Sequence, residues 1–476
     1  MARPGIVSIA AYLPRSRVER ATIANATAWA NPAAARATGS RTACNWDEDS
    51  ITMAVAAARH ATPASVRANV ESLWFASTTL PFQDRDNAVL IAEALALPPA
   101  AHAMTITSSQ RAAVSSLIAA AARPGLQLVV AADRRVAKPG SDQELRYGHA
   151  GAAALLGSDE PIADILGYAT HSSDLVDHYR AAGESFDYSL EERWVRDEGY
   201  LKLAPQAIRA ALQVASVAGT DVQHLAFHGP ASVGAKVAQL SGLSRTSVAD
   251  TLESRIGDTG AAHPLLLLAA TLQAAQPGQT IVLVGFGQGV DVVVLRATEH
   301  VVRVGRQLSM QLDAGVKEPH YLRFLSNAGL VAMDWGMRAE RDNRTAQSVA
   351  YRRRGEITAF IGGQCRQCGT VQFPRARACV NPECRALDTL EPHPLAETHG
   401  RVKSFTEDWQ AFSPRPPLVY GNIELAGGGN LLMEVTDIES GELQIGDEVA
   451  VTFRIKDVDR LRGFRRYFWK AVRIRS

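Results

Sequence analysis

The chain has 476 residues, enough for two or three domains with several hydrophobic cores. Its 50 Lys and Arg residues against 49 Asp and Glu residues give a net charge of +1, so no overall basic field favours nucleic acid or an anionic membrane. Hydrophobic residues make up 46%, as in ordinary soluble proteins, and no apolar run approaches the roughly 20 residues of a membrane span. We therefore predict a cytoplasmic protein that binds neither nucleic acid nor membrane.

Residues 1–298 alternate strand-like and helix-like segments. Two longer amphipathic segments, 47–61 and 191–215, predict helices. Short apolar segments predict strands at 5–13, 72–78, 126–133, 152–158, 224–229, 280–287 and 290–297. Such an alternation is typical of an α/β fold in which helices cover parallel strands.

Two parts of this region resemble each other. The stretch "SSQRAAVSSLIAAAARPGLQLVVAAD" (108–133) and the stretch "IGDTGAAHPLLLLAATLQAAQPGQTIVLVGFG" (256–287) each contain a polar turn, a helix, a Pro-Gly turn and an apolar strand. This order predicts an internal duplication, with one half at 1–165 and the other at 166–298. Two unrelated units that look alike by chance are the alternative.

Residues 299–355 lack a clear period and predict a linker with helices. Beyond them, four of the five cysteines form two close pairs, C-x2-C and C-x4-C, separated by ten residues. Two such thiolate pairs supply the closed tetrahedral set of a structural zinc site. We predict a zinc ribbon at 356–390, and the alternative is a decayed ribbon held by packing alone. The predicted zinc ligands are Cys365, Cys368, Cys379 and Cys384.

Residues 391–476 contain short alternating apolar segments separated by Gly and Asp turns. About five strands in this space predict a small barrel of the OB type. OB barrels and zinc ribbons often bind nucleic acid, but the near-neutral charge and the lack of a basic stripe with interleaved aromatic residues argue against that function here.

With these motifs in view, residues 1–298 resemble the thiolase superfamily, above all the branch of 3-hydroxy-3-methylglutaryl-CoA (HMG-CoA) synthase and β-ketoacyl-ACP synthase III. The matching pieces are "DEDSITMAVAAAR", "HLAFHGP", "GDTGAAHPLLLLAATL" and "PGQTIVLVGFGQG". Residues 356–476 resemble the zinc-ribbon and OB module that accompanies thiolase-like enzymes, through "CRQCGTVQFPR", "SFTED", "IGDEVAVTF" and "YFWK". The resemblance implies a duplicated, layered αβαβα fold followed by a zinc ribbon and an OB-like barrel. It also implies a homodimer that could join another CoA-pathway enzyme.

The resemblance also points to site residues. Alignment of the family motif C-x-x-G-T-A-A-L puts Gln110 in the place of the acyl-accepting cysteine, and Thr78 stands where HMG-CoA synthases have a catalytic glutamate. The family histidine of F-H-x-P is retained as His228, and Asp258 replaces the asparagine of G-N-T. His263 is similar to the G-H-P histidine of degradative thiolases.

Glutamine cannot form an acyl thioester, so this set implies chemistry without a cysteine acyl-enzyme. Gln110 can donate its amide to a thioester oxygen, His228 can act as a general acid, a base or a second donor, and Asp258 can move a proton or cap the next helix. We predict an enzyme, a lyase or an acyltransferase, that makes or cleaves a C–C bond on a coenzyme A thioester through an enolate, with aldol or retro-aldol chemistry favoured. Decarboxylation of a malonyl-type thioester and a catalytically degenerate scaffold subunit are the alternatives.

Overall fold

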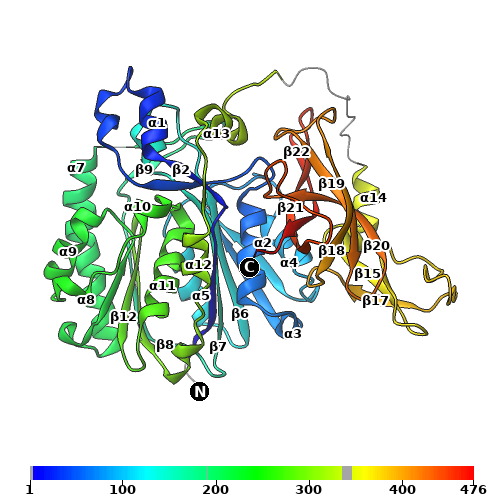
Figure 1. Ribbon diagram of the computed structural model, residues 1–476. Coiled ribbons are helices and arrows are strands. Elements are labelled where there is room, and N and C mark those ends of the chain that lie inside the picture. The colour runs from blue at the N-terminus through cyan, green and yellow to red at the C-terminus, as the bar shows by residue number, and fades with distance from the viewer. Residues whose placement is uncertain (1–3, 190, 335–345, 476) are drawn as a thin grey trace. The chain divides into compact units, whose positions relative to one another are not determined.

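The computed structural model describes residues 4–189, 191–334 and 346–475 (Figure 1). The chain forms two compact units. The first comprises Met1–Cys44, Asp49–Val89 and Pro98–Phe324, and the second comprises Asn45–Glu48, Leu90–Leu97 and Leu325–Ser476. Residues 335–345 of the predicted linker lie outside the described residues, and its boundaries stay a prediction. Among the described helices, none has the length and apolar character needed to cross a membrane.

The first unit is built on a nine-stranded sheet. Its strands, in spatial order, are β11 (His224–Phe227), β12 (Thr280–Phe286), β13 (Gly289–Ala297), β8 (Ala163–Ser172), β1 (Gly5–Tyr12), β7 (His149–Gly157), β6 (Leu126–Arg134), β4 (Val70–Ala76) and β5 (His102–Ile106). The two halves of the sheet meet at β1 and β8, which pair through only two residues each.

The sheet is mixed, which corrects the expectation of parallel strands. Only the pairs β4–β5, β4–β6 and β11–β12 are parallel, and the other neighbours run antiparallel. The reason lies in the connections, since parallel neighbours need a long crossover. β12 and β13 are joined by the two-residue turn Gly287–Gln288, and β6 reaches β7 through one short helix, α6 (Asp142–Arg146).

Helices cover the two half-sheets in layers. The helices α5 (Ala112–Ala121) and α11 (His263–Ala274) lie between the halves, α2 (Ser50–Ala61) packs outside on β1, β6 and β7, and α8 (Ala204–Ala215) packs outside on β8 and β13 (Figure 1). The order αβαβα and the repeated pairs α5–β6 and α11–β12 confirm the predicted duplicated fold. The Asp49 side chain starts α2 by accepting hydrogen bonds from the backbone of Ile51 and Thr52.

Shorter elements complete the first unit. They are β2 (Ser16–Glu19), α1 (Arg20–Thr27), β3 (Ser40–Ala43), α3 (Ala64–Arg67), β9 (His178–Tyr179), β10 (Tyr188–Ser189), α7 (Glu192–Trp194), the π-helix Val195–Leu203, α9 (Ala231–Leu240), α10 (Glu253–Ile256), α12 (Gln307–Asp313) and β14 (Val316–Lys317). Two further helices, α4 (Asn87–Ala94) and α13 (Tyr321–Ala328), each contribute residues to both units.

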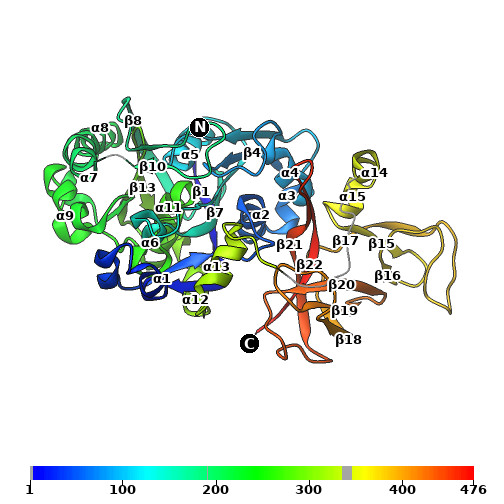
Figure 2. The same ribbon diagram turned by 90° about the horizontal axis from the view of Figure 1, so that it is seen from above.

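The second unit contains a ribbon and a barrel. After α14 (Gln347–Arg352) and α15 (Arg354–Ile357), the ribbon strands are β15 (Ile361–Cys365), β16 (Val371–Gln372) and β17 (Leu390–Pro394). The closed barrel, visible from above in Figure 2, has the order β18 (Gly400–Asp408), β19 (Leu418–Leu425), β20 (Asn430–Thr436), β22 (Phe464–Arg473) and β21 (Glu448–Asp459). The five predicted strands are all present, and the OB-like architecture is confirmed.

Candidate active site

The turn that carries Gln110 is fixed by the other half of the duplication. The backbone carbonyl of Gly287 accepts hydrogen bonds from Ser109 Oγ at 2.8 Å and from Arg111 Nε at 3.0 Å. A Cβ at Gly287 would lie 2.9 Å from Ser109 Oγ and 3.1 Å from the backbone nitrogen of Gln110, so only glycine fits this close approach. The start of α5 is therefore locked against the β12–β13 turn, and Gln110 is held there with 8% of its surface exposed.

Two cavities meet at Gln110. One has a volume of about 570 Å³ and is also lined by His228, Asp258 and Glu253, and the other has a volume of about 360 Å³ and is also lined by Thr78. The residues that line both cavities are Gln110, Arg135, Tyr147, Asp177 and His178. Gln110 thus lies where a ligand extending through both cavities would pass.

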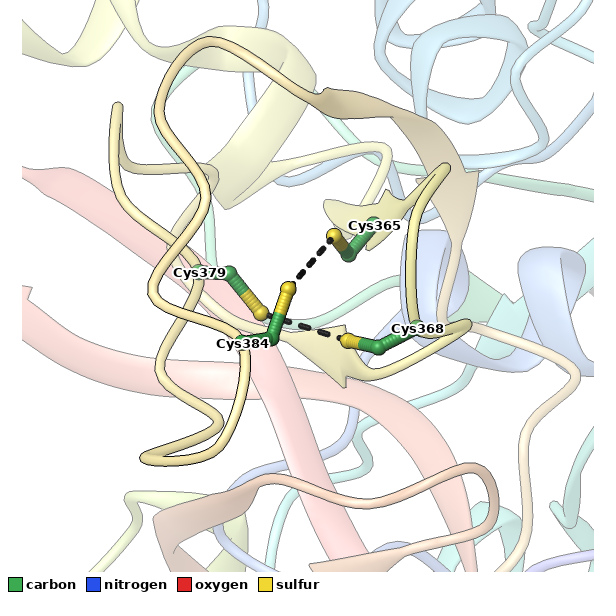
Figure 3. A group of neighbouring side chains, drawn as sticks. All are labelled: Cys365, Cys368, Cys379 and Cys384. Atoms are coloured by element: carbon green, nitrogen blue, oxygen red, sulfur yellow. Dashed lines mark hydrogen bonds between the residues drawn. The ribbon is translucent and has the colours of Figure 1, made fainter.

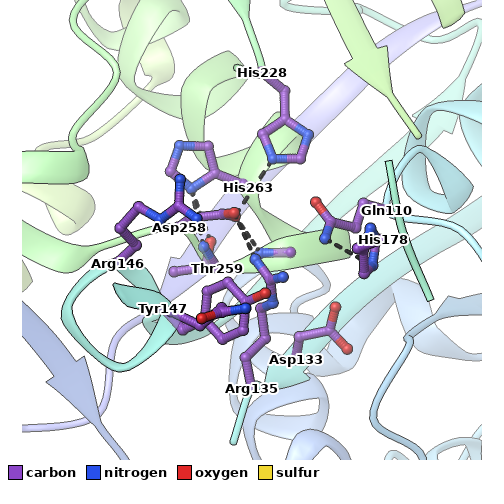
Figure 4. Close-up of polar contacts among 12 residues, drawn as sticks. Gln110, Asp133, Arg135, Arg146, Tyr147, His178, His228, Asp258, Thr259 and His263 are labelled. Atoms are coloured by element: carbon purple, nitrogen blue, oxygen red, sulfur yellow. Dashed lines mark hydrogen bonds and ion pairs between the residues drawn. The ribbon is translucent and has the colours of Figure 1, made fainter. Parts of the chain in front are cut away.

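Asp258 is bound from several sides. Its carboxylate accepts hydrogen bonds from Arg135 Nη1 at 2.5 Å and from the backbone N–H of Gly260 at 2.9 Å, and it lies 3.4 Å from His228 Nε2 (Figure 4). Burial raises the pKa of this carboxyl, but the charge of Arg135 and the hydrogen bond from His228 outweigh it and hold the pKa well below its usual range. A carboxylate that stays ionised is a poor proton carrier, so the geometry favours an anchoring role over the expected proton transfer.

Arg135 is a site residue that the sequence reasoning missed. Its guanidinium lies 3.4 Å from the ring centroid of Tyr147 and 3.5 Å from Asp187 Oδ2, in addition to its bond to Asp258. The Tyr147 hydroxyl in turn donates to Asp187 at 2.6 Å. In the sequence, Arg135 ends the run "ADRR" after a strand, where an arginine is usually solvated, so no local signal marks it.

His228 presents one ring nitrogen to Asp258 and leaves the other free. It follows β11 directly, and its Nδ1 is buried with no hydrogen-bond partner among the described residues. In Figure 4 that nitrogen is turned away from Asp258, to the side on which Gln110 lies. A buried, unpaired polar atom at a cavity is a feature of ligand-binding positions.

His263 lies next to His228 and lines neither cavity. It is 1% exposed, its Nε2 lies 2.9 Å from the carbonyl oxygen of Thr251, and its Nδ1 lies 3.1 Å from Thr259 Oγ1. Burial, followed by the nearby His228, lowers its pKa to about 4, so the ring is neutral. Its centroid lies 5.1 Å from that of His228, which favours a supporting role for His263 over direct catalysis.

A second missed group is the pair Asp177 and His178. His178 Nδ1 lies 2.6 Å from Asp177 Oδ2, and its Nε2 lies 3.1 Å from the amide nitrogen of Gln110 (Figure 4). The pair stands in the segment "SSDLVDHYRAAG" after β8, where His178 begins the two-residue strand β9, and neither a family motif nor a regular period surrounds it. The only available signal was an Asp-His dipeptide in a polar loop, which is common at protein surfaces.

Two further carboxylates lie near the cavities. The Asp133 carboxylate accepts hydrogen bonds from the hydroxyls of Thr78 and Thr79 and from the backbone of Ala261, so Thr78 serves as an internal donor. Glu253 is partly exposed to the larger cavity. Burial and then the charge of Asp258 raise its pKa to about 7.

The four cysteines of the ribbon converge, as predicted (Figure 3). Their sulfurs all lie within 4.8 Å of one another, with Cys365 Sγ and Cys384 Sγ 3.9 Å apart and Cys368 Sγ and Cys379 Sγ 3.5 Å apart. A tetrahedral ion with Zn–S bonds of about 2.3 Å needs sulfurs about 3.8 Å apart. The residues therefore fit structural zinc, and four thiolates leave no open position for catalysis.

Comparisons with known proteins agree with this architecture. The family described as the C-terminal part of 3-oxoacyl-(acyl-carrier-protein) synthase III matches residues 212–296. The ChsH2 rubredoxin-like zinc ribbon family matches residues 359–389, and the ChsH2 C-terminal OB-fold family matches residues 393–454.

Single relatives point the same way. The hydroxymethylglutaryl-CoA synthase of Pyrococcus furiosus is 27% identical over 300 residues, 60% of this chain and 83% of the relative. The HMG-CoA synthase PksG of Bacillus subtilis superposes with a TM-score of 0.60 at 16% identity, over 69% of this chain and 89% of its own. The 3-oxoacyl-(acyl carrier protein) synthase III of Pseudomonas aeruginosa has a TM-score of 0.56 at 21% identity, over 62% of this chain and 98% of its own.

The chain joins a thiolase-like unit, similar to HMG-CoA synthases and to 3-oxoacyl-(acyl-carrier-protein) synthase III, to a zinc ribbon and an OB-fold domain of the ChsH2 type.

Proposed function

We propose that the protein makes or cleaves a C–C bond on an acyl-CoA thioester through an enolate, in aldol or retro-aldol fashion, without a covalent acyl-enzyme. The observation that carries the proposal is the position of Gln110. It stands just before a central helix, at the junction of two cavities. The family resemblance places the nucleophilic cysteine of the condensing enzymes at this position. An amide can donate a hydrogen bond there but cannot accept an acyl group.

No cysteine thiol takes the place of Gln110 as an acyl acceptor. None of the five cysteines is among the described residues that line either cavity. Cys44 is buried with its sulfur 3.6 Å from that of Met53, and the other four form the ribbon cluster. These positions support a non-covalent mechanism.

The lining of the larger cavity suits a CoA thioester. Tyr200, Val233 and Phe286 provide an apolar wall for the pantetheine and acyl chains. Arg146, Arg193 and Arg196 line the same cavity with exposed side chains, and guanidinium groups are well matched to phosphates. Their present partners are exposed carboxylates, and such pairs are weak enough for phosphate to replace them. Among structurally similar proteins, MvaS has been solved in complex with HMG-CoA, and an HMG-CoA synthase in complex with CoA.

Charge development in the reaction is matched by nearby donors. In the proposed mechanism the thioester oxygen accepts a hydrogen bond from the Gln110 amide, aided by the positive end of α5. His228 exchanges a proton through Nδ1 while ionised Asp258 holds its Nε2. Arg135 keeps that carboxylate ionised, so the pair can stabilise the ring in either protonation state.

The test combines intact-protein mass spectrometry with product analysis. Wild-type protein is incubated with acetyl-CoA, malonyl-CoA and a panel of 3-hydroxyacyl-CoAs, beside Gln110→Ala, Gln110→Cys and the surface control Val214→Cys. We expect wild type to release a smaller acyl-CoA and a carbonyl product without gaining mass. We expect Gln110→Cys to become acylated and Val214→Cys to stay free, because only the first sulfur would face the thioester.

Each result has a direct meaning. A stable acyl adduct on the wild-type chain would contradict the non-covalent mechanism. If no thioester reacts, and Gln110→Cys is no more acylated than the control, the proposed function is wrong and the site is a relic in a scaffold.

A further inference from the structure

His178 has one ring nitrogen against Asp177, and its other nitrogen, Nε2, faces Gln110 and the proposed reaction centre. Because Nδ1 lies against a carboxylate, it carries the proton and donates to Asp177, so Nε2 has the lone pair. That lone pair accepts the Gln110 amide N–H at 3.1 Å, and the Asp177 carboxylate is itself held by the backbone N–H of Gln288 at 3.3 Å. The imidazole is thus fixed in one tautomer with its basic nitrogen directed at residue 110.

Two His–Asp pairs consequently lie on either side of Gln110. His228 with Asp258 comes from β11 and the loop before α11, whereas His178 with Asp177 comes from the loop after β8. Figure 4 shows Gln110 beside His178, with His228 and Asp258 on the other side of its amide. Enolate chemistry needs a base at the α-carbon and an acid at the carbonyl partner, and a single His–Asp pair supplies only one of them at a time.

We propose that His178 is the catalytic base that removes the α-proton of the acyl-CoA, with Asp177 as its positioning residue. The proposal rests on the proposed function and assigns the proton transfers within it. When the thioester oxygen takes over the Gln110 N–H, Nε2 of His178 loses its partner and becomes free to accept a proton. Ligand binding at Gln110 and activation of the base are then one event.

The step balances in atoms and charge. The Cα–H bond breaks, its proton goes to His178 Nε2, and its electron pair moves into the enolate whose oxygen is held by Gln110. The enolate carbon then bonds to the carbonyl carbon of the second substrate, and the resulting alkoxide takes a proton from Nδ1 of His228, which enters the step as an imidazolium and leaves it neutral. Exchange with water restores both rings. In the cleavage direction each proton moves the opposite way, and protonated His178 delivers its proton to the α-carbon.

Exchange of the α-hydrogens tests this step apart from C–C chemistry. Acetyl-CoA and propionyl-CoA are incubated in D2O with wild type, His178→Ala, Asp177→Asn and the control His224→Ala, whose residue lies on β11 and lines neither cavity. Mass spectrometry follows deuterium uptake, and calorimetry follows binding of S-(2-oxopropyl)-CoA, a ketone analogue that cannot be hydrolysed. We expect His178→Ala to slow uptake by at least about 100-fold and Asp177→Asn by about 10-fold, with the analogue binding as in wild type.

Rescue by added imidazole distinguishes a catalytic His178 from a purely structural one, because imidazole can replace a missing base but not a missing packing contact. It should restore deuterium uptake in His178→Ala and leave the other proteins unchanged. If wild type takes up deuterium and His178→Ala does so at the same rate, His178 is not the base, and the proposed function stays intact. Turnover without any uptake by wild type would overturn the assignment of His178 in the same way. If wild type neither turns over a thioester nor exchanges, the proposed function fails and this inference falls with it.

Discussion

Asp258 and Arg135 show how single side chains set the character of this site. The ion pair is short and its guanidinium is buried. Removal of one partner leaves a charge without its counterion, which costs more than removal of both.

We expect Asp258→Asn to lower the free energy of unfolding by about 2 kcal/mol, because buried Arg135 loses its closest carboxylate and keeps the more distant Asp187. The double variant Arg135→Gln/Asp258→Asn should recover part of that loss. Urea unfolding of wild type, both single variants and the double variant measures the coupling. If the two single-variant losses in unfolding free energy add up to the loss in the double variant, the interaction between Arg135 and Asp258 does not stabilise the fold.

Glu253 should make the stability of the first unit depend on pH. Its pKa of about 7 in the folded protein lies above the ordinary 4.5, because burial and Asp258 outweigh His228, Arg20 and Arg146. Between these values the folded state binds more proton than the unfolded state, so stability falls as pH rises through this window. Glu253→Gln should therefore raise stability by about 1 kcal/mol near pH 8 and change little near pH 4.5. An equal effect at both pH values would contradict the assigned pKa.

The site was predictable where a residue stands in a motif and unpredictable where only the fold assembles it. Gln110 and His228 lie in recognisable sequence contexts and line one cavity together. Arg135 and His178 come from a strand end and a polar loop, and their roles depend on partners far away in sequence. Local patterns carry no information about such pairings.

At the scale of elements, the barrel buries charges as well as apolar side chains. Lys470 on β22 is 3% exposed and lies 3.0 Å from Asp47 and 3.2 Å from Glu434 of β20. The ammonium also lies 4.4 Å from the ring centroid of Trp46. Each of these groups stays charged because the others compensate it.

We expect Lys470→Met to destabilise the second unit by about 3 kcal/mol, since buried Asp47 loses its counterion. Asp47→Asn/Lys470→Met should be closer to wild type than either single variant. Thermal unfolding followed by near-ultraviolet circular dichroism reports on the barrel through Trp469, which is buried. A double variant that is less stable than both singles would refute this account.

The ribbon should depend on its metal. We expect one zinc per chain by plasma mass spectrometry, and loss of that zinc in Cys379→Ser. Chelation should abolish protease resistance of residues 359–389 and leave deuterium exchange of acetyl-CoA unchanged, because the thiolates leave no catalytic position on the ion. Cys44→Ser is the matched control, since Cys44 lies apart from the cluster.

Elements with a strong period were predictable, whereas weakly patterned ones were not. Apolar β6 and β12 and the five barrel strands follow from the sequence. β8 was missed because its side chains alternate between buried and exposed without an apolar run, and β5 because it is a partly exposed edge strand. Strand direction could not be inferred either, because it depends on connections whose lengths the periodicity does not give.

At the scale of the whole molecule, sequence order and compact units do not coincide. The second unit takes Asn45–Glu48 and Leu90–Leu97 from the N-terminal part of the chain, in addition to Leu325–Ser476. Asp47 and Glu48 supply counterions to Lys470 and Arg454 in the barrel. A zinc ribbon and an OB barrel look self-sufficient in sequence, but part of their charge balance comes from residues more than 300 positions away.

Because of this arrangement, the effect of Lys470→Met on stability should have opposite signs in the full chain and in a C-terminal fragment. In the full chain, Lys470→Met should destabilise the second unit, because it leaves Asp47 uncompensated. In a fragment of residues 325–476 Asp47 is absent, and Lys470 has Glu434, which Lys456 also neutralises. There the ammonium gains little from a carboxylate that is already neutralised, so the same change should be neutral or stabilising by about 1 kcal/mol. Melting temperatures of the four proteins, with Lys403→Met at an exposed ion pair as the control, measure the reversal. A loss of the same size in fragment and full chain would mean that the barrel does not depend on Asp47.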